Sequence, residues 1–333
     1  MPDAVRPEAE PEMQLLFSVL RFAGAIVLAA LIVNFAELYR YIPNRAEHGP
    51  KQVPMRFDPV QFDAGGFGGV KFAGAWTLSA PDPRMGGLSA IAVDGGGLLT
   101  LSDSGVVVRF PKPGAARPMA RIDELPDGPG DPGLKRNRDS ESLARDGAGR
   151  GWWVGFEFRN ALWLFDLPFE RVLARGRIGR GWPRTGFEAM TQSDGKMLLV
   201  PESGRKLLEA SPGHSQWVPL PAGPVSDATQ LPDGSLLVVQ RSLRIDGFHN
   251  RLVQVRREGD RFVKLRSIPL GVGRFDNVEG VAVEPRGAGS LRLWLITDDG
   301  HQWPQRTLLL ALDWPSATGG GAVKRLRRSR SGP

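Results

Sequence analysis

The segment GFEAMTQSDGKMLLVPE, residues 186–202, holds the pattern that decides the fold. It has a short apolar strand, a turn at Asp194 and Gly195, and a second strand, with Glu188 before the first strand and Glu202 after the second. Two short apolar strands joined by Asp-Gly predict a β-hairpin. Antiparallel pairing returns Glu202 to a position beside Glu188, so we expect both carboxylates at the open end of the hairpin.

The same pattern occurs five times along the chain. The copies start at Gly87, Asp139, Gly186, Ser226 and Asp276, and a spacing of roughly 40 to 50 residues suits a four-stranded blade. Together with strand-like segments from Val70 and Thr307, the copies predict an all-β fold, a β-propeller of six blades with one blade shared between the two ends of the chain. Five or seven blades are alternatives. A β-sandwich would leave the repeated acidic pattern unexplained.

Composition agrees with a large all-β domain. The 333 residues include 42 Gly and 28 Pro, and 41% of the chain is hydrophobic, which indicates many short elements joined by tight turns around a sizeable core. The absence of cysteine excludes a disulfide framework, a thiolate zinc site and a cysteine nucleophile. No G-x-S-x-G motif occurs, so an α/β-hydrolase triad is not expected.

The first apolar segment, residues 14–38, is long enough to cross a bilayer of roughly 30 Å. We predict an uncleaved transmembrane signal-anchor helix there, with a removed signal as the alternative, and a membrane-anchored protein whose main domain is exported to the periplasm or the cell exterior. The acidic extension 1–13 precedes this segment, and Met13 is an alternative start. The remaining boundaries predicted are a linker over 39–64, the propeller over 65–315 and a disordered basic tail over 316–333.

The formal net charge of +7 depends mainly on that tail. Without its five basic residues the charge falls to about +2, so the folded part is nearly balanced. A disordered, solvated tail explains the excess of positive charge better than a specific binding arm does. We therefore expect no nucleic-acid partner. We also expect the protein to be a monomer.

The open ends of the five hairpins are expected to converge around one mouth of the channel, because the first strand of each blade lines it. Like charges crowded there need a proton or a cation, and oxygen ligands favour a hard divalent ion, calcium first. Salt bridges between blades, for example to Arg138, are the alternative. The predicted catalytic residues are Glu188, Glu202, Arg241 and Asp299, and the predicted metal ligands are Glu141, Glu157, Asp227, Glu279, Asp103 and Asp298.

Five ordered motifs over about residues 65–313 also carry a family resemblance. These are GGLSAI at Gly86, DSE followed by WWVGFE, GFEAM with LLVPE, LPDGSLLVVQRS, and DNVEGVAVEP with LITDDG. In them the chain resembles the phytase-like domain family, described by an esterase-like activity of phytase. The resemblance implies a propeller that hydrolyses ester or phosphoester bonds. The family often continues the last acidic pair with Asn and an aromatic, where this chain has Gly300 and His301.

Two functions from different classes follow. In the first, calcium at the acidic mouth polarises an ester or phosphoryl oxygen of a small-molecule substrate and activates a water, while Arg241 binds the anionic part of that substrate. In the second, the propeller is a non-catalytic binding module at the membrane surface, whose cations neutralise the ring.

Overall fold

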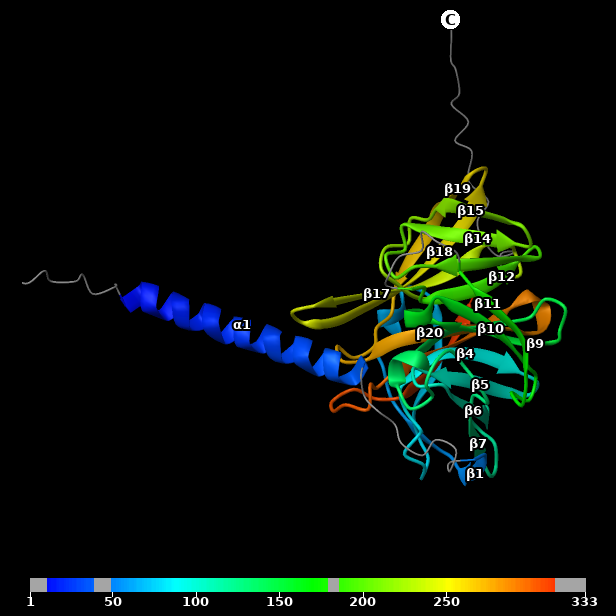
Figure 1. The fold of residues 1–333 in the computed structure, drawn as a ribbon, viewed down its shortest axis with the longest axis horizontal. Helices are drawn as coiled ribbons and strands as arrows, with labels where there is room; N and C mark the ends of the chain where they lie inside the picture. Colours follow the sequence, from blue (N-terminus) through cyan, green and yellow to red (C-terminus); the bar gives the residue numbers. More distant parts are fainter. Residues whose placement is uncertain (1–10, 39–48, 179–185, 315–333) are drawn as a thin grey trace, which may run out of the picture.

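The computed structural model describes residues 11–38, 49–178 and 186–314, and the last two ranges form five antiparallel sheets around a central channel (Figure 1). Each sheet is one blade of a propeller. The five innermost strands contact one another in succession, and the last contacts the first, so the ring is closed. The predicted all-β propeller is confirmed.

Three blades are each built from one continuous run of chain. From the channel outward their strands are β8 (Ser140–Arg145), β9 (Gly151–Phe156), β10 (Ala161–Asp166) and β11 (Val172–Arg177); β12 (Ala189–Ser193), β13 (Lys196–Val200), β14 (Lys206–Ser211) and β15 (His214–Pro219); and β16 (Val225–Gln230), β17 (Leu236–Arg244), β18 (Gly247–Glu258) and β19 (Arg261–Pro269).

The other two blades recruit strands from the beginning of the propeller. One consists of β4 (Leu88–Asp94), β5 (Gly97–Ser102), β6 (Val106–Pro111), β7 (Met119–Glu124) and β1 (Lys51–Pro54); the other consists of β20 (Asn277–Pro285), β21 (Leu291–Asp298), β22 (Leu308–Trp314), β3 (Lys71–Ser79) and β2 (Arg56–Pro59). Short 3-10 turns lie at Ala64–Phe67 (η2), Lys135–Asn137 (η3), Glu157–Arg159 (η4) and Gly287–Gly289 (η5).

The propeller has five blades, so the prediction of six is wrong. The two terminal segments pair with each other, with Leu310 of β22 opposite Ala75 of β3. They therefore supply the outer strands that the copy at Asp276 lacks and add no blade of their own. The blade shared between the two ends of the chain was predicted, and its pairing closes the ring. The propeller begins at Lys51, inside the segment 39–64 expected to be a linker.

The hairpin at residues 186–202 forms as expected. Asp194 and Gly195 have φ angles of 49° and 76°, the left-handed values that a tight hairpin turn requires at both central residues. Ala189 pairs with Val200, and the Glu188 N–H donates to the Val200 carbonyl at 3.0 Å. The strands thus bring residue 188 next to the end of β13.

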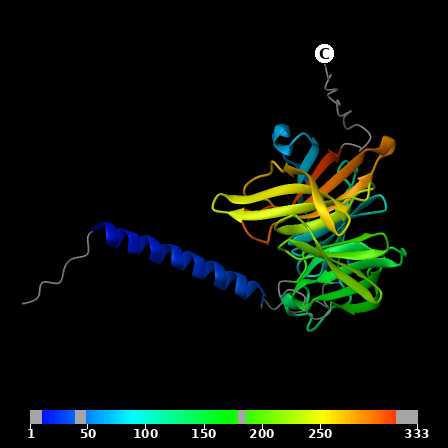
Figure 2. The same cartoon turned by 90° about the horizontal axis from the view of Figure 1, so that it is seen from above.

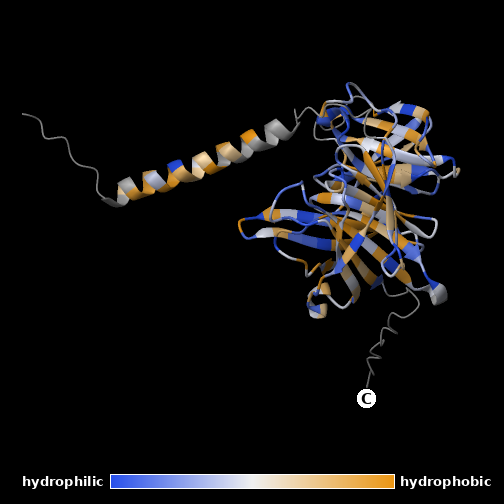
Figure 3. Cartoon of the chain, turned by 90° about the horizontal axis from the view of Figure 1, so that it is seen from below, coloured by the Kyte–Doolittle hydropathy of each residue, from blue (hydrophilic) through white to orange (hydrophobic). Residues whose placement is uncertain are grey.

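Apolar clusters fill the interfaces between neighbouring blades. We call the sheet formed by β20, β21, β22, β3 and β2 the closing blade. In one cluster, Leu237 and Leu252 of the β16–β19 blade pack with Leu293 and Leu310 of the closing blade. Comparable clusters join each of the other neighbouring pairs, and Figure 3 shows the apolar residues along the strands of the propeller. Since a fully buried Leu stabilises a fold by about 1.5–3 kcal/mol, these interfaces hold the blades at fixed positions around the channel.

Helix α1 (Pro11–Leu38) extends away from the propeller (Figures 1 and 2). Among the described residues, no helix is long and apolar enough to cross a membrane. Ser18 and Arg21 interrupt the sequence of α1, and the apolar run after Arg21 is roughly 12 residues, about 18 Å of helix against about 30 Å of hydrocarbon. The prediction of a transmembrane helix and a membrane-anchored protein is therefore wrong. The expectations for residues 1–10, 39–48 and 315–333 lie outside the described residues.

Candidate functional site

A β-bulge at the start of the innermost strand recurs in four blades. The pairing register with the second strand shifts by one residue near the beginning of β4, β8, β16 and β20. A bulge adds one unpaired residue to a strand and redirects its side chain. Glu141 and Glu279 are two of these bulged residues, and Ser89 and Ser226 are the others. In the remaining blade, Glu188 lies immediately before β12.

The second strand of each blade brings another polar residue to the same end of the channel. Glu157 follows β9, and Arg241 lies on β17. Glu188 lies close enough to interact electrostatically with Glu157, Glu279, Arg241 and Glu202. We call this end of the channel the acidic mouth; it contains Asp103, Asp139, Glu141, Glu157, Glu188, Glu202, Glu279 and Asp298 together with Lys135 and Arg241.

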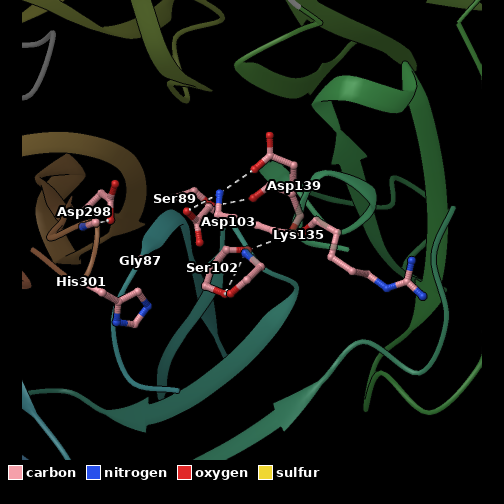
Figure 4. A network of polar contacts seen from close by, with 12 residues as sticks. Gly87, Ser89, Ser102, Asp103, Lys135, Asp139, Asp298 and His301 are labelled. Carbon is pink, nitrogen blue, oxygen red and sulfur yellow. Dashed lines mark hydrogen bonds and ion pairs between the residues drawn. The ribbon is translucent and has the colours of Figure 1, made fainter. Parts of the chain in front are cut away.

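Lys135 and Asp139 belong to the mouth and were missing from the predicted site. The Lys135 ammonium lies 2.7 Å from Asp103 Oδ2 and donates to Asp139 Oδ1 at 3.0 Å, so it bridges two blades (Figure 4). Lys135 comes from η3, in the loop between β7 and β8. The basic run KRNR directly before Asp139 was the available signal, but a basic loop is usually solvated and its direction depends on the fold.

Arg241 is the second cation of the mouth. Its guanidinium donates to Asn277 Oδ1 at 3.0 Å and forms an ion pair with Glu279, while Asn277 Nδ2 donates to Glu279 Oε1 at 2.7 Å. Attraction to Glu279 raises the pKa of Arg241 despite its burial. The Arg241 side chain is thus fixed by two contacts, to Asn277 and Glu279, at the edge of the acidic cluster, with N–H groups left to bind an anion.

Burial and mutual repulsion raise the pKa values of the glutamates at the mouth. Burial first, then the charge of Asp139, raises the pKa of Glu157 to about 8. Burial and the charges of Asp139 and Glu188 raise the pKa of Glu141 well above its usual value. The pKa of Glu188 is raised in the same way by burial, Glu157 and Glu279. In the absence of a bound cation, part of this cluster therefore holds protons at neutral pH.

Two predicted site residues are held by hydrogen bonds within the fold. Asp227 follows the bulge of its strand by one residue, so its carboxylate is buried along the channel and accepts the amides of Ala228 and Val281 at 2.7 Å each. Asp299 accepts hydrogen bonds from the Gly87 amide at 2.9 Å and the Thr307 hydroxyl at 2.7 Å. Both carboxylates are occupied by bonds that hold neighbouring segments together.

Asp103 and Asp298 border the mouth on the side of the closing blade. Burial and the charge of Asp103 raise the pKa of Asp298 well above its usual value. Gly87 has a φ of 60°, and a side-chain carbon there would lie 2.8 Å from Asp103 Oδ1 and 3.2 Å from His301 Nε2. The glycine therefore makes room for both side chains, and Figure 4 shows His301 beside it.

The donor set of the mouth suits a hard cation. Asp139, Glu141 and Glu157 each offer an oxygen within 4.8 Å of the others. Asp103 Oδ1 is buried nearby and has no hydrogen-bond partner among the described residues. Calcium prefers several oxygen ligands of this kind, so the residues present fit the predicted ion. Glu141 and Glu157 were predicted as ligands and Asp139 was not; the other predicted ligands, Asp103, Asp227, Glu279 and Asp298, are outside this group of three.

The metal-free protein is expected to lose thermal stability as the pH rises from about 5 to about 9. The pKa of Glu157 is about 8 in the folded chain and about 4.3 in an unfolded one. Between these values the folded state binds more protons, so its stability is present at the lower pH and is lost as the pH rises through the folded pKa. Denaturation temperatures measured in chelator would test this. Glu157→Gln, which stays neutral, should show a smaller fall, and a temperature that holds constant or increases would contradict the electrostatics described here.

The sequence matches one family of known proteins, and the fold resembles those of several solved structures. A family model described as "Phytase-like: Esterase-like activity of phytase" matches residues 83–301, well over half of the chain. The glutaminyl cyclase of Myxococcus xanthus is 13% identical, with a TM-score of 0.48 over 78% of this chain and 98% of that one. Hydrazine synthase of Kuenenia stuttgartiensis is 12% identical, with a TM-score of 0.39 over 65% of this chain and 57% of its own. No curated protein matches.

Proposed function

The chain belongs to the phytase-like family, whose model is described by an esterase-like activity of phytase, and on this premise we propose that it hydrolyses ester or phosphoester bonds at the acidic mouth. The observation that carries the proposal is a convergence of carboxylates that the fold leaves largely uncompensated. Lys135 is bound to Asp103 and Asp139, and Arg241 to Glu279. Among the described residues, no ion pair is formed by Glu141, Glu157 or Glu188. Such a cluster is costly to fold and is typical of a functional site.

Calcium is the cation that we propose for this site. Asp139, Glu141 and Glu157 would hold it, with Asp103 Oδ1 as a further acceptor. A bound calcium ion would act as a Lewis acid on the ester or phosphoryl oxygen. Its charge would also relieve the repulsion that raises the pKa values of these glutamates.

Two side chains of the mouth would act directly on the substrate, and a third lies where the substrate would enter. Arg241 is held in place by Asn277 and Glu279 and presents N–H groups to the anionic part of a phosphoester or a carboxylate product. Glu188 is buried, and burial together with the charges of Glu157 and Glu279 raises the pKa of its carboxyl well above the usual value. The protonated form is thereby favoured, which suits a general acid that donates to the leaving oxygen. Glu202 is exposed at the rim, where an entering substrate would pass.

Calcium titration of the full-length chain by calorimetry, paired with a screen of chromogenic carboxylic and phosphate esters, is expected to show binding together with calcium-dependent turnover. Chelation should lower the rate by at least roughly 10²-fold, because the developing negative charge loses its main electrostatic partner. Calcium binding without turnover of any ester would indicate a binding module instead. Turnover that chelator leaves unchanged would exclude the cation from the proposed mechanism.

A further inference from the structure

A second cavity opens at the end of the channel opposite the acidic mouth. It has a volume of about 490 Å³, and all five innermost strands, β4, β8, β12, β16 and β20, contribute to its wall. We call it the distal cavity. The polar side chains in its wall include Asp94, Arg145, Thr191, Gln192 and Gln230. A volume in this range accommodates a small metabolite.

The two carboxylates that line the distal cavity are already paired within the fold. Asp94 accepts from the Arg109 guanidinium at 3.1 Å. Asp227 accepts two backbone amides at 2.7 Å each, and its burial raises the pKa of the carboxyl well above the usual value, which disfavours its charge. Negative charge in this cavity is therefore largely compensated before any ligand binds.

The Arg145 guanidinium in the cavity wall is not paired in this way. Arg145 is exposed, its guanidinium stacks over the Trp152 ring at 4.9 Å, and within the described ranges no carboxylate lies at ion-pair distance from it. Trp152 is only 2% exposed, so its ring is held in place beneath the guanidinium.

We propose that the distal cavity binds the oxyanion group, phosphate or carboxylate, of a small molecule through Arg145. Its guanidinium is a cation that only donates hydrogen bonds, which favours an anion over a cation or an apolar ligand. The stacking on Trp152 holds the guanidinium at the cavity wall, so less side-chain freedom is lost on binding. Because the cavity faces away from the acidic mouth, this ligand would bind independently of a substrate at the mouth.

Calorimetric titration of the full-length chain in calcium-depleted buffer, at constant ionic strength, tests the proposal with inorganic phosphate and with acetate as separate probes. At least one probe is expected to bind the wild-type chain, and the tighter of the two identifies the anion class. Arg145→Gln should weaken that binding at least tenfold. Trp152→Phe keeps an aromatic ring under Arg145 and should bind within twofold of the wild-type chain, whereas Trp152→Leu removes the stacking and should weaken binding severalfold.

Arg175→Gln is the matched control, because Arg175 is also exposed and stacks over an indole, Trp163, at 4.7 Å, but lies outside the distal cavity. This variant should bind within twofold of the wild-type chain. Arg241→Gln removes the anion contact proposed at the acidic mouth, so the binding that remains in it belongs to the distal cavity and should be lost when Arg145→Gln is added. The proposal fails if neither anion binds, if Arg145→Gln binds as tightly as the wild-type chain, if Arg175→Gln loses as much affinity as Arg145→Gln, or if Arg241→Gln abolishes all binding. Wild-type affinity in Trp152→Leu would remove the stacking on Trp152 from the proposal.

Discussion

Glu188→Gln is expected to lower the rate of ester or phosphoester hydrolysis by about 10²- to 10⁴-fold while raising the thermal stability of the metal-free protein. Glu188 lies at the centre of the mouth, near Glu157, Glu279 and Arg241. Glutamine keeps the shape of the side chain but cannot donate an acidic proton or carry a charge. The loss of activity would follow from the first change. The gain in stability would follow because glutamine has no ionised form for burial and the neighbouring carboxylates to disfavour.

The two effects of Glu188→Gln separate a functional role from a structural one. A residue that merely supported the fold would lose activity and stability together, and the denaturation temperature at about pH 8 in chelator distinguishes the cases. Glu284→Gln is a suitable control, because Glu284 pairs with Lys112 outside the mouth and should leave turnover unchanged. Full activity in Glu188→Gln would exclude this carboxyl from the proposed mechanism.

Lys135→Met is expected to destabilise the metal-free protein by about 3–5 kcal/mol, the usual result of removing one partner from a buried ion pair. The Lys135 side chain is 12% exposed and the Asp139 side chain 4%. Although burial opposes its charge, attraction to Asp103 and Asp139 raises the pKa of Lys135, so the ammonium is the main compensation for these two carboxylates. Methionine has a similar length and no charge.

The measurement is the denaturation temperature, which should fall by roughly 6 to 20 °C for a domain of this size, and added calcium should restore part of the loss. Lys112→Met provides the control, since Lys112 pairs with Glu284 in a more exposed position, with side-chain exposures of 25% and 23%. That variant should lose at most about 1 kcal/mol. Equal changes in the two variants would show that Lys135 has no special role at the mouth.

Local signals in the sequence were sufficient for the repeated unit of this protein. An Asp-Gly turn between two short apolar strands forms its hairpin from neighbouring residues, so the closeness of residues 188 and 202 follows from counting along the chain. Glu141 and Glu157 are brought together by the same local pairing of β8 with β9. These pairs could be predicted because their contacts depend on short separations in sequence.

The direction of single side chains was harder to predict. Asp227 matched the acidic pattern by its distance from the turn, but the bulge in β16 falls at Ser226, and the aspartate consequently turns into the channel. Strand side chains alternate between faces with a period of two, so one inserted residue reverses the direction of the next. Lys135 was missed because its loop crosses from one blade to another, and its partners Asp103 and Asp139 come from both.

The sequence by itself therefore determined the all-β class, the five hairpins and the acidic residue at the open end of several of them, because each depends on local turn chemistry and strand periodicity. The tertiary structure alone decided that the blades number five, since β3 and β22 complete one sheet across most of the chain length. It also decided which carboxylates share the mouth and which donors line the distal cavity. Those groupings arise when five strands pack around one channel. Contacts between segments far apart in the chain produce no recognisable pattern in the local sequence.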